Sequence, residues 1–121
     1  MKRIALTGIG NALVDIEYRV TEEELLAFGV QKGAMTLTEA SRQAELIASL
    51  SDRDAHRSSG GSAANTVIAF AQFGGTAAFK SLLGRDDFGT VYAGEFTDLG
   101  IELDAELVDG EPTGTCLVMI T

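Results

Sequence analysis

The strongest constraint on the fold of this chain is a regular alternation of strand-like and helix-like segments separated by glycines. Over residues 13–20, apolar side chains alternate with polar ones, which predicts a strand with one buried face. Residues 62–73 and 88–99 are instead typical of helices, each followed by glycine, and residues 76–83 between them predict another strand. This alternation favours an α/β fold with a mainly parallel sheet.

Shorter signals predict the remaining elements. Thr21 and Glu24 form a capping-box pattern that begins a short helix ending at Gly29. We expect a strand over residues 34–37, and then a helix that Thr38 caps and that carries an apolar stripe. The stripe consists of Ala40, Ala44, Ile47 and Leu50.

Two irregular regions complete the chain. Residues 51–59 predict a loop that leads to Gly60, and residues 113–121 are rich in strand-forming side chains. The last stretch stops without a turn, so we expect a strand that is cut in its middle. The turn at residues 84–87 ends in aspartates that can cap the helix that follows.

Composition excludes several classes of partner and site. The net charge of −9, from 18 acidic and 9 basic residues, opposes binding to nucleic acid or to an anionic membrane surface. With Cys116 as the one cysteine and His56 as the one histidine, the chain has no internal disulfide and no site with several such ligands. We therefore expect a cytoplasmic protein without a metal site of its own.

Two glycines near the start invite comparison with a dinucleotide-binding turn, which the sequence does not support. The Gly8-Ile9-Gly10 stretch would need a third glycine or alanine where Leu13 stands, and a helix where residues 13–20 alternate like a strand. A glycine turn between strands is the better interpretation. The chain also has no glycine-lysine phosphate loop of the Walker type.

A second glycine pair carries more information about function. Gly60 and Gly61 stand directly before a helix of small residues, so a ligand could approach the backbone N–H groups there closely. Asn65 lies one turn inside that helix, and its amide can both donate to and accept from hydroxyl groups. From the residues alone, a flexible loop with a helix cap explains the same pattern.

The segment from Ser59 to Gly75, SGGSAANTVIAFAQFGG, resembles the amino-terminal signature of the pfkB or ribokinase family. Further pieces agree in order: GNALVDI from Gly10, the residues 34–37, GRDDFG from Gly84 and PTGTC from Pro112. Within the family, the chain is most similar to adenosine kinases, although sugar kinases share much of the pattern.

This resemblance implies a partial ribokinase-like three-layer α/β fold, with a mainly parallel sheet, flanking helices and a small β lid. Residues 1–121 would be the amino-terminal part of one kinase domain, with lid strands near residues 13–20, 34–37 and 113–121. The implied substrate-binding residues are Asn11, Leu13, Asp15, Met35, Gly60, Gly61, Ser62, Asn65 and Cys116. Gly84, Asp86 and Gly89 match a family turn whose role is either ligand contact or the start of a helix.

The resemblance also implies an activity, the transfer of a phosphoryl group from ATP with Mg²⁺ to a hydroxymethyl group of a nucleoside or sugar. Family members use a Gly-Ala-Gly-Asp type of segment for this step, and the chain has none, so we assign no catalytic residue and expect no activity from the chain alone. Lid strands of such kinases can pair between subunits, which implies a homodimer. The alternative is a noncatalytic module for small-ligand binding or subunit association.

Overall fold

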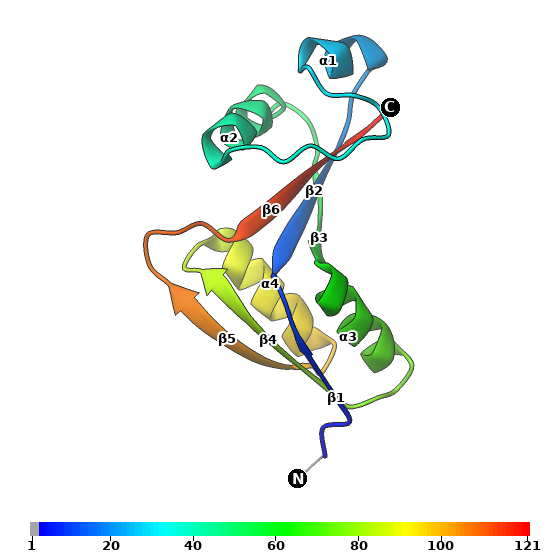
Figure 1. Ribbon diagram of the computed structural model, residues 1–121, viewed down its shortest axis with the longest axis vertical. Helices are drawn as coiled ribbons and strands as arrows, with labels where there is room; N and C mark the ends of the chain where they lie inside the picture. The colour runs from blue at the N-terminus through cyan, green and yellow to red at the C-terminus, as the bar shows by residue number, and fades with distance from the viewer. Residues whose placement is uncertain (1–2) are drawn as a thin grey trace. The chain divides into compact units, whose positions relative to one another are not determined.

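The protein is described by a computed structural model that covers residues 3–121. Its ten elements follow one another along the chain as Figure 1 shows. In chain order they are β1 (Leu6–Ile9), β2 (Leu13–Arg19), α1 (Glu22–Ala27), α2 (Ala40–Ser49), β3 (His56–Gly60), α3 (Ser62–Gln72), β4 (Ala77–Gly84), α4 (Asp87–Asp98), β5 (Glu102–Val108) and β6 (Gly114–Ile120). The chain divides into two compact units, Met1–Asp15 with Ser58–Cys116 and Ile16–Arg57 with Leu117–Thr121.

The first unit contains a parallel sheet in the order β1-β4-β5. Leu6 of β1 pairs with Ala77 of β4, and Phe79 of β4 pairs with Leu103 of β5. The helices α3 and α4 connect into β4 and β5, as parallel neighbours require a crossover. The predicted α/β class with a mainly parallel sheet is therefore confirmed.

The core of this unit lies between the sheet and its two helices. Phe79 on β4 is fully buried, and its ring centroid lies 5.3 Å from that of Phe96 on α4. Tyr92, one turn before Phe96, stacks on it at 4.7 Å, while Val67 of α3 is also buried. Lys80 and Leu82 point to the other face of β4 and are exposed. Within residues 3–121, the helices thus supply one covering layer of the expected three-layer fold.

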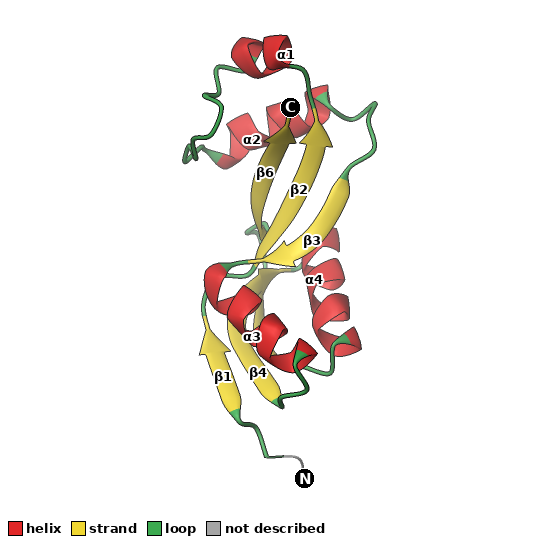
Figure 2. Cartoon of the chain, turned by 90° about the vertical axis from the view of Figure 1, so that its right-hand side faces the viewer, coloured by secondary structure: helices red, strands yellow, loops and turns green. Residues whose placement is uncertain are grey.

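The second unit holds α1, α2 and parts of a sheet in the order β3-β2-β6. Strands β2 and β6 run in the same direction and β3 runs opposite to them (Figure 2). The apolar side chains Ile16 and Tyr18 of β2 are buried here, together with Leu25 of α1 and Leu46 of α2. The alternation that predicted a strand over residues 13–20 is confirmed.

The first turn of α1 is fixed in the way that its sequence predicts. The Thr21 hydroxyl accepts a hydrogen bond from the N–H of Glu24, and the Glu24 carboxylate accepts one from the N–H of Thr21 at 2.8 Å. Arg53 donates to the same carboxylate and, at 3.0 Å, to the carbonyl oxygen of Arg19. Arg53 therefore ties α1 to the end of β2.

Several predictions about individual elements were wrong. Residues 34–37 form no strand, because their backbone pairs with no other strand among the described residues; the segment is an exposed loop. The residue preceding α2 is Glu39 rather than Thr38, and no side chain caps that helix. The strands β3 and β5 were not predicted, and β3 overlaps the expected loop over residues 51–59 and extends one residue beyond it. No helix in the described part of the chain is long and apolar enough to cross a membrane.

Candidate functional site

The two glycines that precede α3 are packed directly against polar groups of the predicted substrate site. A Cβ atom on Gly60 would lie 2.5 Å from Oδ2 of Asp15, and one on Gly61 would lie 2.4 Å from the carbonyl oxygen of Asn11. Both distances are shorter than a side chain tolerates. Gly61 also has φ = 107°, a conformation that favours glycine. Gly61 is therefore required by its close approach to the Asn11 backbone, while Gly60, which has no side chain, leaves room for the Asp15 carboxylate against the turn.

Gly61 is the N-cap residue that immediately precedes α3. Its carbonyl oxygen accepts the first helical hydrogen bond, from the N–H of Asn65 at 2.8 Å. The side chains of Ser62 and Asn65 are exposed on this first turn. Because the first N–H groups of a helix have no acceptor within the helix, the turn offers donors beside the Asp15 carboxylate acceptor. Hydroxyl groups both donate and accept hydrogen bonds, so they can bind to the N–H donors and to the carboxylate acceptor.

A cavity of about 530 Å³ lies in the same unit. Asn11 and Leu13 of the predicted site line it, together with Ser81 and Lys80 of β4. Ser81 donates a hydrogen bond from its hydroxyl to the carbonyl oxygen of Gly10 at 2.6 Å, which fixes the chain at the end of β1. The sequence analysis did not identify Ser81, because this contact joins residues that lie 71 positions apart.

Cys116 on β6 belongs to the same unit and is half-buried. Burial raises the pKa of its thiol, and the negative charge of Asp15 raises it further. The thiol is thus neutral at physiological pH, and it presents a small, weakly polar surface near Asp15.

The helix α4 anchors the strand end that leads into the turn, through two side chains that the sequence analysis missed. The hydroxyl of Tyr92 donates to the carbonyl oxygen of Gly60 at 3.1 Å, in a buried position. The carboxylate of Glu95 accepts hydrogen bonds from the N–H of Ser59, at 2.8 Å, and from its hydroxyl. No local sequence signal could reveal these contacts, which join residues 32 and 36 positions apart.

The GRDDFG and PTGTC segments meet in a polar cluster that has a structural role. Asp86 caps α4 by accepting from the N–H of Gly89 at 2.8 Å, and it also accepts from the N–H and hydroxyl of Thr113. The N–H of Gly84 donates to the Thr113 hydroxyl at 3.0 Å. Although burial raises the pKa of Asp86, the hydrogen bonds from Thr113 and Gly89 hold it below its ordinary value. Of the two roles that were left open for this turn, the geometry supports the start of a helix.

Met35 differs from the other predicted site residues in its placement. It lies in the second unit, in the loop between α1 and α2, and its side chain is 93% exposed. The other eight predicted residues all belong to the first unit. The structure therefore brings together the turn, Asp15 and Cys116, but it gives Met35 no packing partner that would fix its side chain.

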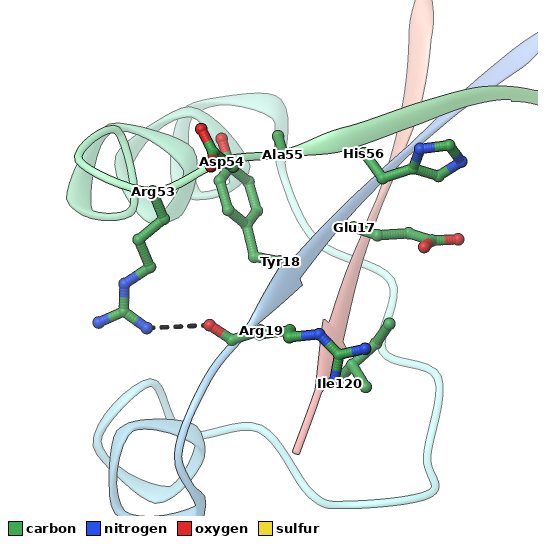
Figure 3. A pocket seen from close by; sticks show the side chains of 8 residues that line it. All are labelled: Glu17, Tyr18, Arg19, Arg53, Asp54, Ala55, His56 and Ile120. Carbon is green, nitrogen blue, oxygen red and sulfur yellow. Dashed lines mark hydrogen bonds between the residues drawn. The ribbon is translucent and has the colours of Figure 1, made fainter.

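The second unit has a hollow of its own, about 540 Å³, which contains none of the predicted site residues. Figure 3 shows Glu17, Arg19 and His56 along the strands, with Arg53 reaching the carbonyl oxygen of Arg19. Since the guanidinium of Arg53 is already paired with Glu24, it serves the attachment of α1. The remaining charges are of both signs and define no single class of ligand.

The fold is shared with solved kinases. A probable sugar kinase from Rhizobium etli superposes with a TM-score of 0.86 at 30% identity, covering 100% of this chain and 36% of that one. The adenosine kinase from Sinorhizobium meliloti gives a TM-score of 0.83 at 34% identity, over 99% of this chain and 36% of that one. The adenosine kinase from Anopheles gambiae, solved with P1,P4-di(adenosine-5) tetraphosphate, gives 0.86 at 26% identity over 99% and 36%.

The chain thus spans about a third of the length of these solved kinases. No curated protein matches its sequence significantly. The sequence profile described as pfkB family carbohydrate kinase matches residues 33–121, which is well over half of the chain and includes the turn at Gly60 and the Asp86 cluster. The glycine turn, its helix and the capped α4 are thus features of a family to which this chain belongs, the pfkB family of carbohydrate kinases.

Proposed function

We propose that this chain is the substrate-binding part of an ATP-dependent kinase that phosphorylates a hydroxymethyl group of a nucleoside or sugar. The observation that carries this proposal is the contact between the Asp15 carboxylate and the Gly60-Gly61 turn at the start of α3. A carboxylate accepts hydrogen bonds from two neighbouring hydroxyl groups, and the N–H groups of the turn donate to oxygen atoms beside them. A ribose-like diol satisfies both sets of groups at once.

The side chains of the site hold and orient the substrate and do not perform the transfer. Asp15 would bind hydroxyl groups, Asn65 would donate and accept one turn further along α3, and Leu13 and Cys116 would contact a less polar part of the substrate. Because the pKa of the Cys116 thiol is raised, this contact is with a neutral group. We identify no catalytic base among these residues, so we expect no turnover from the chain alone.

ATP would supply the phosphoryl group, and Mg²⁺ would neutralise its charge. Within residues 3–121, however, no group of three or more histidine, cysteine, aspartate or glutamate side chains lies together in a way that could hold a metal ion. We assign no residue of this chain to ATP or to Mg²⁺.

A nucleoside is the preferred substrate class. The GNALVDI and PTGTC segments resemble those of adenosine kinases, and two of the solved relatives carry the name adenosine kinase. A simple sugar is the second candidate, because another relative is named a probable sugar kinase.

The test is calorimetric titration of the chain with adenosine, inosine, ribose and fructose. We expect a nucleoside to bind, and we expect Asp15→Asn to weaken that binding by about 1–3 kcal/mol, because charge-assisted hydrogen bonds are lost while the side chain keeps its size. Asp98→Asn, at the exposed carboxyl end of α4, is the matched control and should bind like the wild type. Equal affinity of the Asp15 variant would remove this carboxylate from the site, and binding of sugars alone would overturn the preference for nucleosides.

We also propose a homodimer formed through the sheet β3-β2-β6, in which β2 and β6 correspond to two of the expected lid strands. The strand β6 lies at an edge of this sheet and its Ile120 is 38% exposed, and unpaired strand edges readily associate with another chain. Size exclusion with light scattering at several concentrations tests this, and a monomer at every concentration would contradict it.

A further inference from the structure

The helix α4 reaches the Gly60-Gly61 turn through side chains one turn apart, Tyr92 and Glu95. Both side chains bind backbone groups of the segment that carries the predicted substrate-binding residues. Tyr92 is fully buried between the sheet and Phe96, so its ring cannot move away from the turn without disturbing the aromatic core. Glu95 is half-buried and binds Ser59 twice.

Together these contacts occupy consecutive backbone groups of the turn. The N–H of Ser59 is held by Glu95, the carbonyl of Gly60 by Tyr92, and the carbonyl of Gly61 by the N–H of Asn65. A glycine pair has more conformational freedom than any other dipeptide, so the turn needs such external bonds to keep one conformation. With these groups fixed, the peptide between Gly60 and Gly61 can present its N–H in one direction only.

The chemistry of both side chains suits this role. Burial raises the pKa of Tyr92, and the nearby carboxylates of Glu95 and Asp15 raise it further, so the phenol remains a donor over the whole physiological range. The Gly60 carbonyl is buried, and a buried carbonyl that lost its donor would be left without a partner. The Glu95 carboxylate accepts two hydrogen bonds from one residue, which aligns the strand end as well as its side chain.

Because the turn is the substrate site of the proposed function, we propose that Tyr92 and Glu95 are positioning residues that hold Ser59, Gly60 and Gly61 in the conformation that receives substrate hydroxyl groups. The aromatic core of the first unit, through Tyr92, thereby sets the geometry of the site. Both residues act through the backbone, and neither is a catalytic residue.

The first experiment measures amide hydrogen exchange by NMR in Tyr92→Phe, which keeps the ring and removes the hydroxyl. The amides of Ser59 and Asn65 report opening of the turn, because their acceptors belong to the same set of contacts. We expect both to exchange about tenfold faster, while the amide of Leu103 in β5 keeps its wild-type rate. Tyr18→Phe, at the other tyrosine of the chain, is the matched control and should leave Ser59 and Asn65 unchanged.

The second experiment titrates Tyr92→Phe and Glu95→Gln with adenosine and ribose. Whichever probe binds to the wild type, we expect its affinity for each variant to be about three- to tenfold lower. Glu102→Gln, at an exposed glutamate of β5, is the control and should have the affinity of the wild type. The Glu95→Gln variant keeps an acceptor oxygen, so it should retain more affinity than Glu95→Ala.

Two results would overturn the positioning role. One is equal exchange at Ser59 and Asn65 in Tyr92→Phe and Tyr18→Phe, and the other is faster exchange at these amides with unchanged affinity. A wild type that binds neither probe would overturn the proposed function instead, and the exchange rates at Ser59 and Asn65 would still decide whether Tyr92 holds the turn.

Discussion

Two segments of the predicted substrate site, the turn at Ser59–Gly61 and the loop around Met35, are built in opposite ways. The turn is held by Tyr92, Glu95 and the start of α3, and its glycines fit against Asp15 and Asn11. In the loop, every residue from 31 to 39 is exposed, and a single backbone hydrogen bond, from Ala34 to Gln31, is present within it. The conformation of the turn is therefore fixed by its contacts, whereas the loop has few contacts that would hold it in one conformation.

The largest expected effect follows from replacing a glycine in each segment. Gly61→Ala would place a methyl group 2.4 Å from the Asn11 carbonyl oxygen and would also strain a backbone with φ = 107°. We expect a loss of about 3 kcal/mol in the free energy of unfolding. Gly33→Ala in the loop also has positive φ, but no atom lies within 4 Å of the new methyl group, so we expect a loss of about 1 kcal/mol.

Urea denaturation of the two variants and the wild type measures this difference. The pair separates the cost of backbone conformation, which both positions share, from the cost of the close approach, which only Gly61 has. Equal losses in the two variants would show that the turn is not packed against Asn11 in solution.

The expected effect of intermediate size concerns the ion pair of Arg53 with Glu24, which attaches α1, the helix before the loop. Hydrogen bonding from the Arg53 guanidinium, with further help from the N–H of Thr21, lowers the pKa of Glu24 from 4.5 to about 2. Since the folded pKa lies below the unfolded one, the stabilisation is fully present above pH 4.5. It is lost as the pH falls from there through about 2.

NMR titration of the Glu24 carboxyl carbon follows this loss directly. Resonances of α1 should shift with the same midpoint, and Glu24→Gln should abolish that transition, because the amide does not titrate. The amide of Asn65 should be insensitive over this range, because its acceptor is the carbonyl oxygen of Gly61, which does not titrate. This sharpens the contrast between a segment held by an ion pair and one held by hydrogen bonds to the backbone. A Glu24 midpoint near 4.5 would contradict the ion pair.

Elements with a strong local signal were predictable from the sequence, while strands without an apolar pattern of their own were not. The capping box at Thr21 and the Asp86 cap of α4 involve residues three apart, so the sequence contains the whole interaction. The strand β3 is polar throughout, and its conformation comes from pairing with β2. Residues 34–37, which were expected to form a strand, pair with no other strand among the described residues and form a loop.

The residues of the candidate site also differ in how far the sequence could identify them. The glycines and Asp15 could be identified through the family motif, because their residue types are fixed by close backbone approach and by hydrogen-bonding chemistry. Tyr92 and Glu95 lie on a helix whose sequence pattern indicates only ordinary packing against a sheet. Their role depends on how α4 lies against the end of β3. Only the three-dimensional arrangement could show this contact.

The smallest expected effect is that of Met35→Ala in the loop. Its side chain is 93% exposed, so truncation removes almost no buried apolar surface, and we expect the free energy of unfolding to change by less than about 0.5 kcal/mol. Leu46→Ala, in the neighbouring α2, is buried and should cost about 2–5 kcal/mol, which makes it the control that the denaturation experiment detects lost packing in this unit. A loss above 1 kcal/mol for Met35→Ala would mean that the loop packs in solution and that the two segments are built alike. If the substitution instead leaves stability unchanged and weakens nucleoside binding, then Met35 contacts the ligand from a segment that becomes ordered only upon binding. The turn, which Tyr92 and Glu95 hold before the ligand arrives, would then be the contrasting case.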